Sequence, residues 1–194
     1  DRMYVTKSNS YARRSAQFAL FEVAEILIRL ISPILVFTAE EIWQSHELFR
    51  KQSVSIFMAS QKLLSEIESS ISDEDWKKIF AVKDAVNQSI EKARADSVIK
   101  GSLDSKISIS CDKKTFKALQ KIEDELKFVF ISSEVEIAES SSSGLDIEVT
   151  NFDQKKCIRC WNKCSSVGLY AEDPEICSRC YTNVYGDGEI RKFV

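Results

Sequence analysis

The sequence has little of what membrane and exported proteins need. No stretch reaches the roughly 18 consecutive apolar residues of a membrane span, and the most apolar run, Leu30–Phe37, is interrupted by Ser32 and Pro33. The first residues lack the charged, apolar and small-residue order of a secretory signal. We therefore expect a cytoplasmic protein with no membrane partner. An opening residue other than Met, followed at once by patterned sequence, indicates part of a longer protein.

Histidine and glycine are also scarce. The only histidine, His46, follows Trp43 near a predicted helix end, where a surface or capping role suits it better than chemistry. Gly186 and Gly188 flank Asp187 and indicate a turn rather than a glycine-rich loop for phosphates. Neither feature indicates a catalytic centre.

A strong positive charge is missing too. The 194 residues carry a net charge of −3, whereas dedicated nucleic-acid-binding domains are usually basic. From Gln154 onward, however, seven Lys and Arg stand against five Asp and Glu. This local excess of positive charge fits a local contact with a polyanion. Hydrophobic residues at 44% and charged residues at 29% are typical of a folded globular chain.

Residues 1–100 predict a bundle of helices. Apolar residues recur at helical spacing in two stripes, and a helix apolar on two sides is normally buried among other helices. Pro33 should end or kink this helix, and Thr38 and Glu41 are spaced as in a capping box that starts the next one. A third helix should begin near Ser72. The stripes are Ala16, Ala19, Leu20, Val23, Leu27, Leu30 and Ile34, and Phe18, Phe21 and Ile28.

Residues 101–150 change to an alternating period, which predicts a small α+β unit. An amphipathic helix, Phe116–Val129, should separate the first two of three strands, and Ser140–Gly144 should form a polar turn. The fold class is therefore a mainly α-helical bundle at 1–100, a small α+β unit at 101–150 and a cysteine module at 151–194. The predicted strands are Ile107–Cys111, Val135–Ala138 and Leu145–Val149.

The cysteine module gives the most specific pattern. Cys157 and Cys160 form one Cys-x2-Cys pair, and Cys177 and Cys180 form another after sixteen residues. Each Cys-x2-Cys pair can form a tight turn that directs both sulfurs at one point. Two such turns supply the tetrahedral set of four thiolates that structural zinc prefers. With all four positions filled by protein, we expect one structural Zn²⁺ and no open position for catalysis. In zinc-finger peptides this binding is worth on the order of 10–16 kcal/mol.

Other interpretations of these cysteines fit less well. Disulfides would require export, and a thioredoxin-like redox site would require a different sequence context. The spacing between Cys160 and Cys164 does not match a Cys-x2-Cys pair, so Cys164 is expected to be a spare thiol beside the site. Cys111 lies in a predicted strand and should be a small buried residue. Trp161 directly follows a cysteine pair. It could pack over the zinc site, or stack on an unpaired base for roughly 1–3 kcal/mol.

Several groups of residues resemble a known family. Those in the first hundred residues resemble the helical anticodon-binding domain of class I aminoacyl-tRNA synthetases of the isoleucine type. The ending is similar to the C-terminal zinc finger of bacterial-type isoleucyl-tRNA synthetases. The first set is Asp1-Arg-Met-Tyr4, Asn9-Ser-Tyr-Ala-Arg13-Arg14, Ser32-Pro33 to Trp43, Glu91-Lys-Ala-Arg94-Ala-Asp96 and Lys100-Gly101. The second is Cys157-Ile-Arg-Cys160-Trp161, Ile176-Cys177-Ser-Arg179-Cys180, Asn183-Val and Gly186-Asp-Gly188-Glu-Ile-Arg191-Lys-Phe193.

The resemblance implies a function. The whole protein would use ATP to attach isoleucine to its tRNA, and this part, as a monomer beside the catalytic domain of the same chain, would bind the anticodon stem and loop of isoleucine tRNA. The class I signatures, His-Ile-Gly-His and Lys-Met-Ser-Lys-Ser, are absent from the sequence, so this part should be inactive alone. Expected phosphate contacts, which position RNA without reading sequence, are Arg13, Arg14, Arg94 and Lys100. Trp161 should stack on a loop base, surrounded by Arg159, Arg179, Arg191 and Lys192.

Two alternatives stay open at this point. The cysteine motif also resembles the zinc-finger nucleic-acid-binding module of formamidopyrimidine-type DNA glycosylases, although the pattern from Pro33 to Trp43 is typical of synthetases. The second alternative is a zinc-stabilised interaction domain with a purely structural role.

Overall fold

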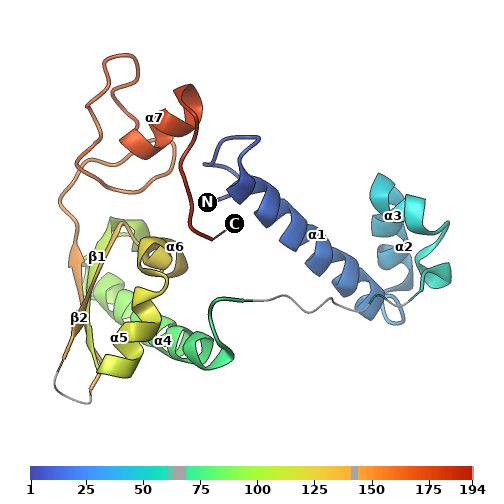
Figure 1. Cartoon of the computed structure of the whole chain (residues 1–194), viewed down its shortest axis with the longest axis horizontal. Helices are drawn as coiled ribbons and strands as arrows, with labels where there is room; N and C mark the ends of the chain where they lie inside the picture. The colour runs from blue at the N-terminus through green and yellow to red at the C-terminus, as the bar shows by residue number, and fades with distance from the viewer. Residues whose placement is uncertain (61, 63–68, 141–143, 194) are drawn as a thin grey trace. The chain divides into compact units, whose positions relative to one another are not determined.

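The computed structural model describes residues 1–60, 62, 69–140 and 144–193, which form two compact units (Figure 1). The sheet unit consists of Asp1, Met3–Lys7 and Ser69–Lys192. The helical unit contains the described residues from Ser8 to Lys62, together with Arg2 and Phe193. Within this described part, no helix has the length and apolarity needed to cross a membrane.

The helical unit is built from α1, α2, α3 and a short 3-10 helix. Helix α1 begins after Ser10, whose hydroxyl accepts a hydrogen bond from the Arg13 amide, and it ends two residues before Pro33, as predicted. The core gathers around Trp43, whose ring lies 5.2 Å from that of Phe49. The elements are α1 (Tyr11–Ile31), α2 (Val36–Ser45), α3 (Glu47–Gln52) and η1 (Ile56–Met58).

Two details of the helical unit differ from the prediction. Phe21 and Ile28 pack against α2 and α3, but Phe18 of the same stripe and Val23 and Leu30 of the other are exposed, because the described elements of this unit cover α1 on one side only. The predicted capping box is also wrong. Helix α2 begins at Val36 because the turn after α1 leads straight into it, so Thr38 lies inside the helix.

The sheet unit contains a three-stranded mixed sheet in the order β2-β1-β3, with β1 parallel to β2 and antiparallel to β3. Helix α5 connects β1 and β2, and α4 packs against α5 and β3. The apolar side chains of β1, Ile107 and Ile109, face these helices and are fully buried. The elements are α4 (Asp73–Ala95), η2 (Ser102–Asp104), β1 (Ser105–Cys111), α5 (Lys113–Gln120), η3 (Glu123–Glu125), α6 (Leu126–Val129), β2 (Glu134–Glu139), β3 (Asp146–Asn151) and α7 (Ser178–Tyr185).

The predicted fold class is confirmed: helices, a small mixed sheet and a four-cysteine module follow one another. Helix α4 begins after Ser72 as predicted, with the Ser72 hydroxyl accepting from the Asp75 amide. The single helix predicted over Phe116–Val129 is instead broken into α5, η3 and α6, because Ile122 leaves the helical conformation with φ −118° and ψ 25°. Domain boundaries at residues 100 and 150 remain predictions. Most of the polar turn predicted at 140–144 lies outside the described residues.

Candidate zinc centre and nucleic-acid interface

The two cysteine pairs meet in a buried cluster. Their four Sγ atoms all lie within 4.8 Å of one another, and all four residues are buried. The first pair lies on a tight turn closed by hydrogen bonds between Cys157 and Asn162 and between Trp161 and Cys157. Cys177 caps the N-terminus of α7, and Cys180 lies in its first turn. The positive end of the helix dipole therefore faces the sulfurs and favours thiolates.

The spacing of the sulfurs fits a metal ion rather than disulfides. A tetrahedral zinc site with Zn–S bonds of about 2.3 Å places its sulfurs about 3.8 Å apart, and the Sγ atoms of Cys160 and Cys177 are 3.7 Å apart. A disulfide would need about 2.05 Å between sulfurs. The Cys177 amide also points at the Cys157 sulfur at 3.4 Å, which stabilises negative charge there. The donor set fits one structural zinc ion.

Four thiolates cannot share so small a volume without a cation. In the protein alone, hydrogen bonds from Cys177 and Cys180 lower the pKa of Cys160 well below its usual range. The hydrogen bond with Cys160 raises the pKa of Cys180 to about 12. Only part of the cluster would then be ionised at neutral pH, and a divalent cation supplies the charge that the remaining thiolates need.

The other cysteines occupy the expected places. Cys164 packs beside the cluster but is not one of the four, and its Sγ lies 3.4 Å from the Ser166 hydroxyl. Cys111 is buried in β1, and this burial raises the pKa of its thiol. His46 is exposed at the start of α3 and contacts Phe49, with ring centroids 4.8 Å apart.

Asn183 joins the zinc module to the first residues of the chain, a role that its place in the motif did not reveal. Its side-chain oxygen accepts hydrogen bonds from the amides of Lys7 and Glu189, both at 3.1 Å. Its side-chain nitrogen donates to the Glu189 carboxylate at 3.1 Å and to the Arg179 carbonyl at 3.0 Å. The Gly186–Gly188 segment forms the predicted turn after α7, and Gly188 needs its glycine because φ is +91°.

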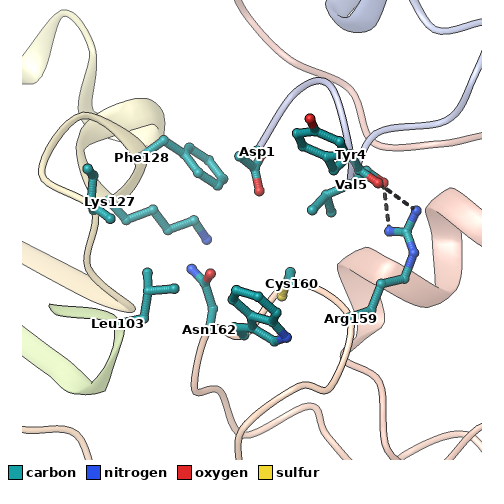
Figure 2. A pocket seen from close by; sticks show the side chains of 11 residues that line it. Asp1, Tyr4, Val5, Leu103, Lys127, Phe128, Arg159, Cys160 and Asn162 are labelled. Carbon is teal, nitrogen blue, oxygen red and sulfur yellow. Dashed lines mark hydrogen bonds between the residues drawn. The ribbon is translucent and has the colours of Figure 1, made fainter. Parts of the chain in front are cut away.

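A cavity of about 720 Å³ opens beside the zinc cluster (Figure 2). Aromatic rings of Tyr4, Phe128 and Trp161 line it, together with the cationic side chains of Lys127 and Arg159. This volume lies within the range of small-molecule sites, roughly 300–1,000 Å³. The lining thus combines flat aromatic surfaces, which suit stacking on a base, with the cationic Lys127 and Arg159 and the acidic Asp1.

Two residues of this cavity have unusual backbone conformations. Among described non-glycine residues, only Ser97, Ile131 and Trp161 have positive φ, and the last two both line the cavity. These two residues are 55% and 61% exposed, so burial does not compensate the roughly 1–2 kcal/mol that each left-handed residue costs. Most of the surface of Trp161 is therefore open to solvent.

The predicted RNA-contacting cations lie in different environments. Arg14, Arg94 and Lys100 are exposed, and Arg13 is half-buried. Arg159 donates hydrogen bonds to the carbonyls of Val5 and Tyr4 (Figure 2). Lys192 is exposed and donates to the Lys121 carbonyl at 3.4 Å.

Arg179 and Arg191 are engaged in ion pairs. Arg179 pairs with Asp1 and Glu189 at 2.9 and 3.2 Å. Arg191 is only 5% exposed and binds both carboxylate oxygens of Glu125, at 2.7 and 2.9 Å. The guanidinium of Arg191 also lies 3.8 Å from the centre of the Phe128 ring. These two arginines attach the zinc module and the C-terminal residues to the α5–α6 region, and RNA contact by either remains a prediction.

Comparison with known proteins agrees with this geometry. Residues 1–109 match the family described as the anticodon-binding domain of tRNA ligase. Residues 154–183 match the zinc finger found in FPG and IleRS. The zinc-finger match alone would allow either a glycosylase or a synthetase, whereas the match over residues 1–109 favours the synthetase.

The chain belongs to the anticodon-binding domain family of tRNA ligases. Over its full length it is similar to isoleucine–tRNA ligases: 40% identical to that of Alcanivorax borkumensis, 39% to that of Pseudoalteromonas translucida and 38% to that of Photorhabdus laumondii. The chain covers 22% of the length of each of these relatives. It therefore corresponds to their anticodon-binding and zinc-finger region.

Proposed function

We propose that this chain is the part of an isoleucine–tRNA ligase that recognises the anticodon stem and loop of isoleucine tRNA. The ATP-dependent attachment of isoleucine belongs to the remaining part of the same protein, which would be the intramolecular partner of this region in a monomer. One Zn²⁺, held by Cys157, Cys160, Cys177 and Cys180, orders the C-terminal module. The ion has a structural role, because the four sulfurs complete its coordination.

The observation that carries this proposal is the exposed Trp161 in the lining of the cavity. Its backbone is held in a left-handed conformation immediately after a proposed zinc ligand, and the residue is 61% exposed. An exposed aromatic platform costs stability without a ligand, but it can stack on an unpaired base of an RNA loop. The rings of Tyr4 and Phe128 and the ammonium group of Lys127 would then surround the base and its phosphate.

A titration of the purified, zinc-containing chain with tRNA tests the function directly. We expect tighter binding to isoleucine tRNA than to valine or methionine tRNA in a gel-shift experiment at one stated salt concentration. Indistinguishable affinities for the three tRNAs would contradict anticodon recognition by this chain. No measurable binding to any of them would contradict the proposed function altogether.

The substitution Trp161→Ala should weaken binding to isoleucine tRNA about 5- to 150-fold, since base stacking is worth roughly 1–3 kcal/mol. The preference over the other tRNAs should fall, while the salt dependence should stay the same. Arg14→Ala provides the contrast. The loss of one exposed phosphate contact should weaken binding to all three tRNAs similarly and lower the slope of log affinity against log salt concentration by about 1.

The zinc content of the Trp161 variant must be measured, because the tryptophan amide closes the turn that holds Cys157. Trp161→Phe, which keeps an aromatic face, should recover part of the lost affinity. If Trp161→Ala retains its zinc and its full preference for isoleucine tRNA, the ring has no part in reading the loop.

A further inference from the structure

Helix α5 carries a row of exposed lysines that the sequence patterns had not singled out. Lys113, Lys114, Lys117 and Lys121, here called the α5 lysines, are all exposed, whereas Ala118 and Leu119 of the same helix are buried. Three of them, at positions 113, 117 and 121, follow each other at four-residue steps, which place side chains about 6 Å apart along one helix face.

The position of these lysines is unfavourable for the helix itself. Lys113 and Lys114 occupy the first turn of α5, which contains no acidic residue, although the helix dipole disfavours positive charge there. Asp112 offsets this cost as the N-cap, because its carboxylate accepts hydrogen bonds from the amides of Lys114 and Thr115. Residues that break a local rule in this way are expected where a function needs them.

Few carboxylates neutralise the row. Lys121 forms an ion pair with Asp75 at 2.6 Å. Within the described part of the chain, Lys113, Lys114 and Lys117 form no ion pair. The Glu74 carboxylate, which lies near Lys114, already binds Lys78 at 2.6 Å. The exposed Glu123 and Asp124 follow in η3, beyond the end of the row.

The open face of the sheet has the opposite charge. The register of the strands brings Glu134, Glu136, Asp146 and Glu148 to this face, and Lys106, the cation of β1 there, is paired with Glu136. The α5 lysines and the carboxylates of the open sheet face therefore lie on opposite sides of the sheet. Such a charge separation orients a polyanion toward α5 and away from the sheet.

The α5 lysines are also connected to the cavity with Trp161. Lys192 donates a hydrogen bond to the Lys121 carbonyl at 3.4 Å. The adjacent Arg191 binds Glu125 immediately before α6, and Lys127 of α6 lines the cavity. Cationic side chains, of which Lys121 and Arg191 are ion-paired, thus lie between α5 and the cavity within one compact unit.

We propose that the α5 lysines bind the phosphate backbone of the anticodon stem while a loop base occupies the cavity beside Trp161. This inference rests on the proposed function, because it needs a bound tRNA. The lysines would contribute affinity for any tRNA and no preference among anticodons, since phosphate contacts position RNA without reading its sequence.

The test is the double substitution Lys113→Ala/Lys117→Ala, compared with Lys92→Ala/Lys106→Ala. The control pair removes the same charge from the α4 side and the open sheet face. Each lost phosphate contact should reduce the salt slope of log affinity by about 0.7–0.9. Between 50 and 200 mM salt, unmodified protein should therefore lose about tenfold more affinity than the α5 variant, whereas the control variant should follow the unmodified protein.

The possible outcomes distinguish a failure of this inference from a failure of the proposed tRNA recognition. If the unmodified chain binds no tRNA, the proposed function fails. If it binds and the α5 and control variants show the same salt slope, the α5 lysines are not a phosphate contact. A changed preference for isoleucine tRNA over valine tRNA in the α5 variant would also contradict a contact with backbone alone. As a folding control, thermal unfolding of the α5 variant is followed by circular dichroism. A midpoint temperature equal to that of the unmodified protein shows that α5 remains folded.

Discussion

Replacing Cys177 with Ser should remove the zinc ion and unfold the module between residues 154 and 192. Structural zinc binding is worth on the order of 10–16 kcal/mol in zinc-finger peptides, which is comparable to the whole stability of most domains, about 5–15 kcal/mol. The cysteine cluster is the principal apolar core of this module, joined by only a few residues such as Val5 and Ile176. Elemental analysis should give one zinc per unmodified chain and clearly less than one for the variant.

Cys164→Ser is the matched control, because that thiol lies beside the cluster without belonging to it. It should retain one zinc per chain and bind tRNA as the unmodified protein does. A Cys177 variant with full zinc content would contradict the proposed ligand set. Chelation should reproduce the effect of Cys177→Ser, and added zinc should reverse it.

Arg191→Ala should lower the free energy of unfolding of the sheet unit by about 3–5 kcal/mol. Removing one partner of a buried ion pair is strongly destabilising, and here the Glu125 carboxylate would lose two hydrogen bonds, at 2.7 and 2.9 Å. The Phe128 ring would also lose the guanidinium that lies 3.8 Å from its centre. Urea denaturation, followed by circular dichroism, measures the change.

The exposed pair of Arg94 and Glu91 serves as the control for this measurement. Its side chains are 49% and 69% exposed, so Arg94→Ala should cost at most about 0.5 kcal/mol. A double-mutant cycle with Glu125→Ala then isolates the coupling between Arg191 and Glu125. Equal losses in the free energy of unfolding for Arg191→Ala and Arg94→Ala would show that the buried pair stabilises the protein no more than the exposed pair.

The cysteine spacing was sufficient to predict the metal-binding cluster. Two turns that each present two thiolates can close around a single ion, whatever the intervening segment does. The start of α4 and the three strands were also predicted correctly, because a serine N-cap and an alternating apolar pattern act over a few residues. The break at Ile122 and the start of α2 were not predicted, because contacts with neighbouring elements decide where a short helix begins and ends.

The local sequence by itself determined the four-cysteine cluster, the order of helices and strands, and the family resemblance. It could not show that Arg191 is buried against Glu125, that Asn183 holds Lys7, or that Ile131 and Trp161 line one cavity. These contacts join residues far apart in the chain, and only the packing of the sheet unit brings them together. Charge separation between α5 and the open sheet face has the same origin, since strand register and helix packing decide which side of the unit each charged residue occupies.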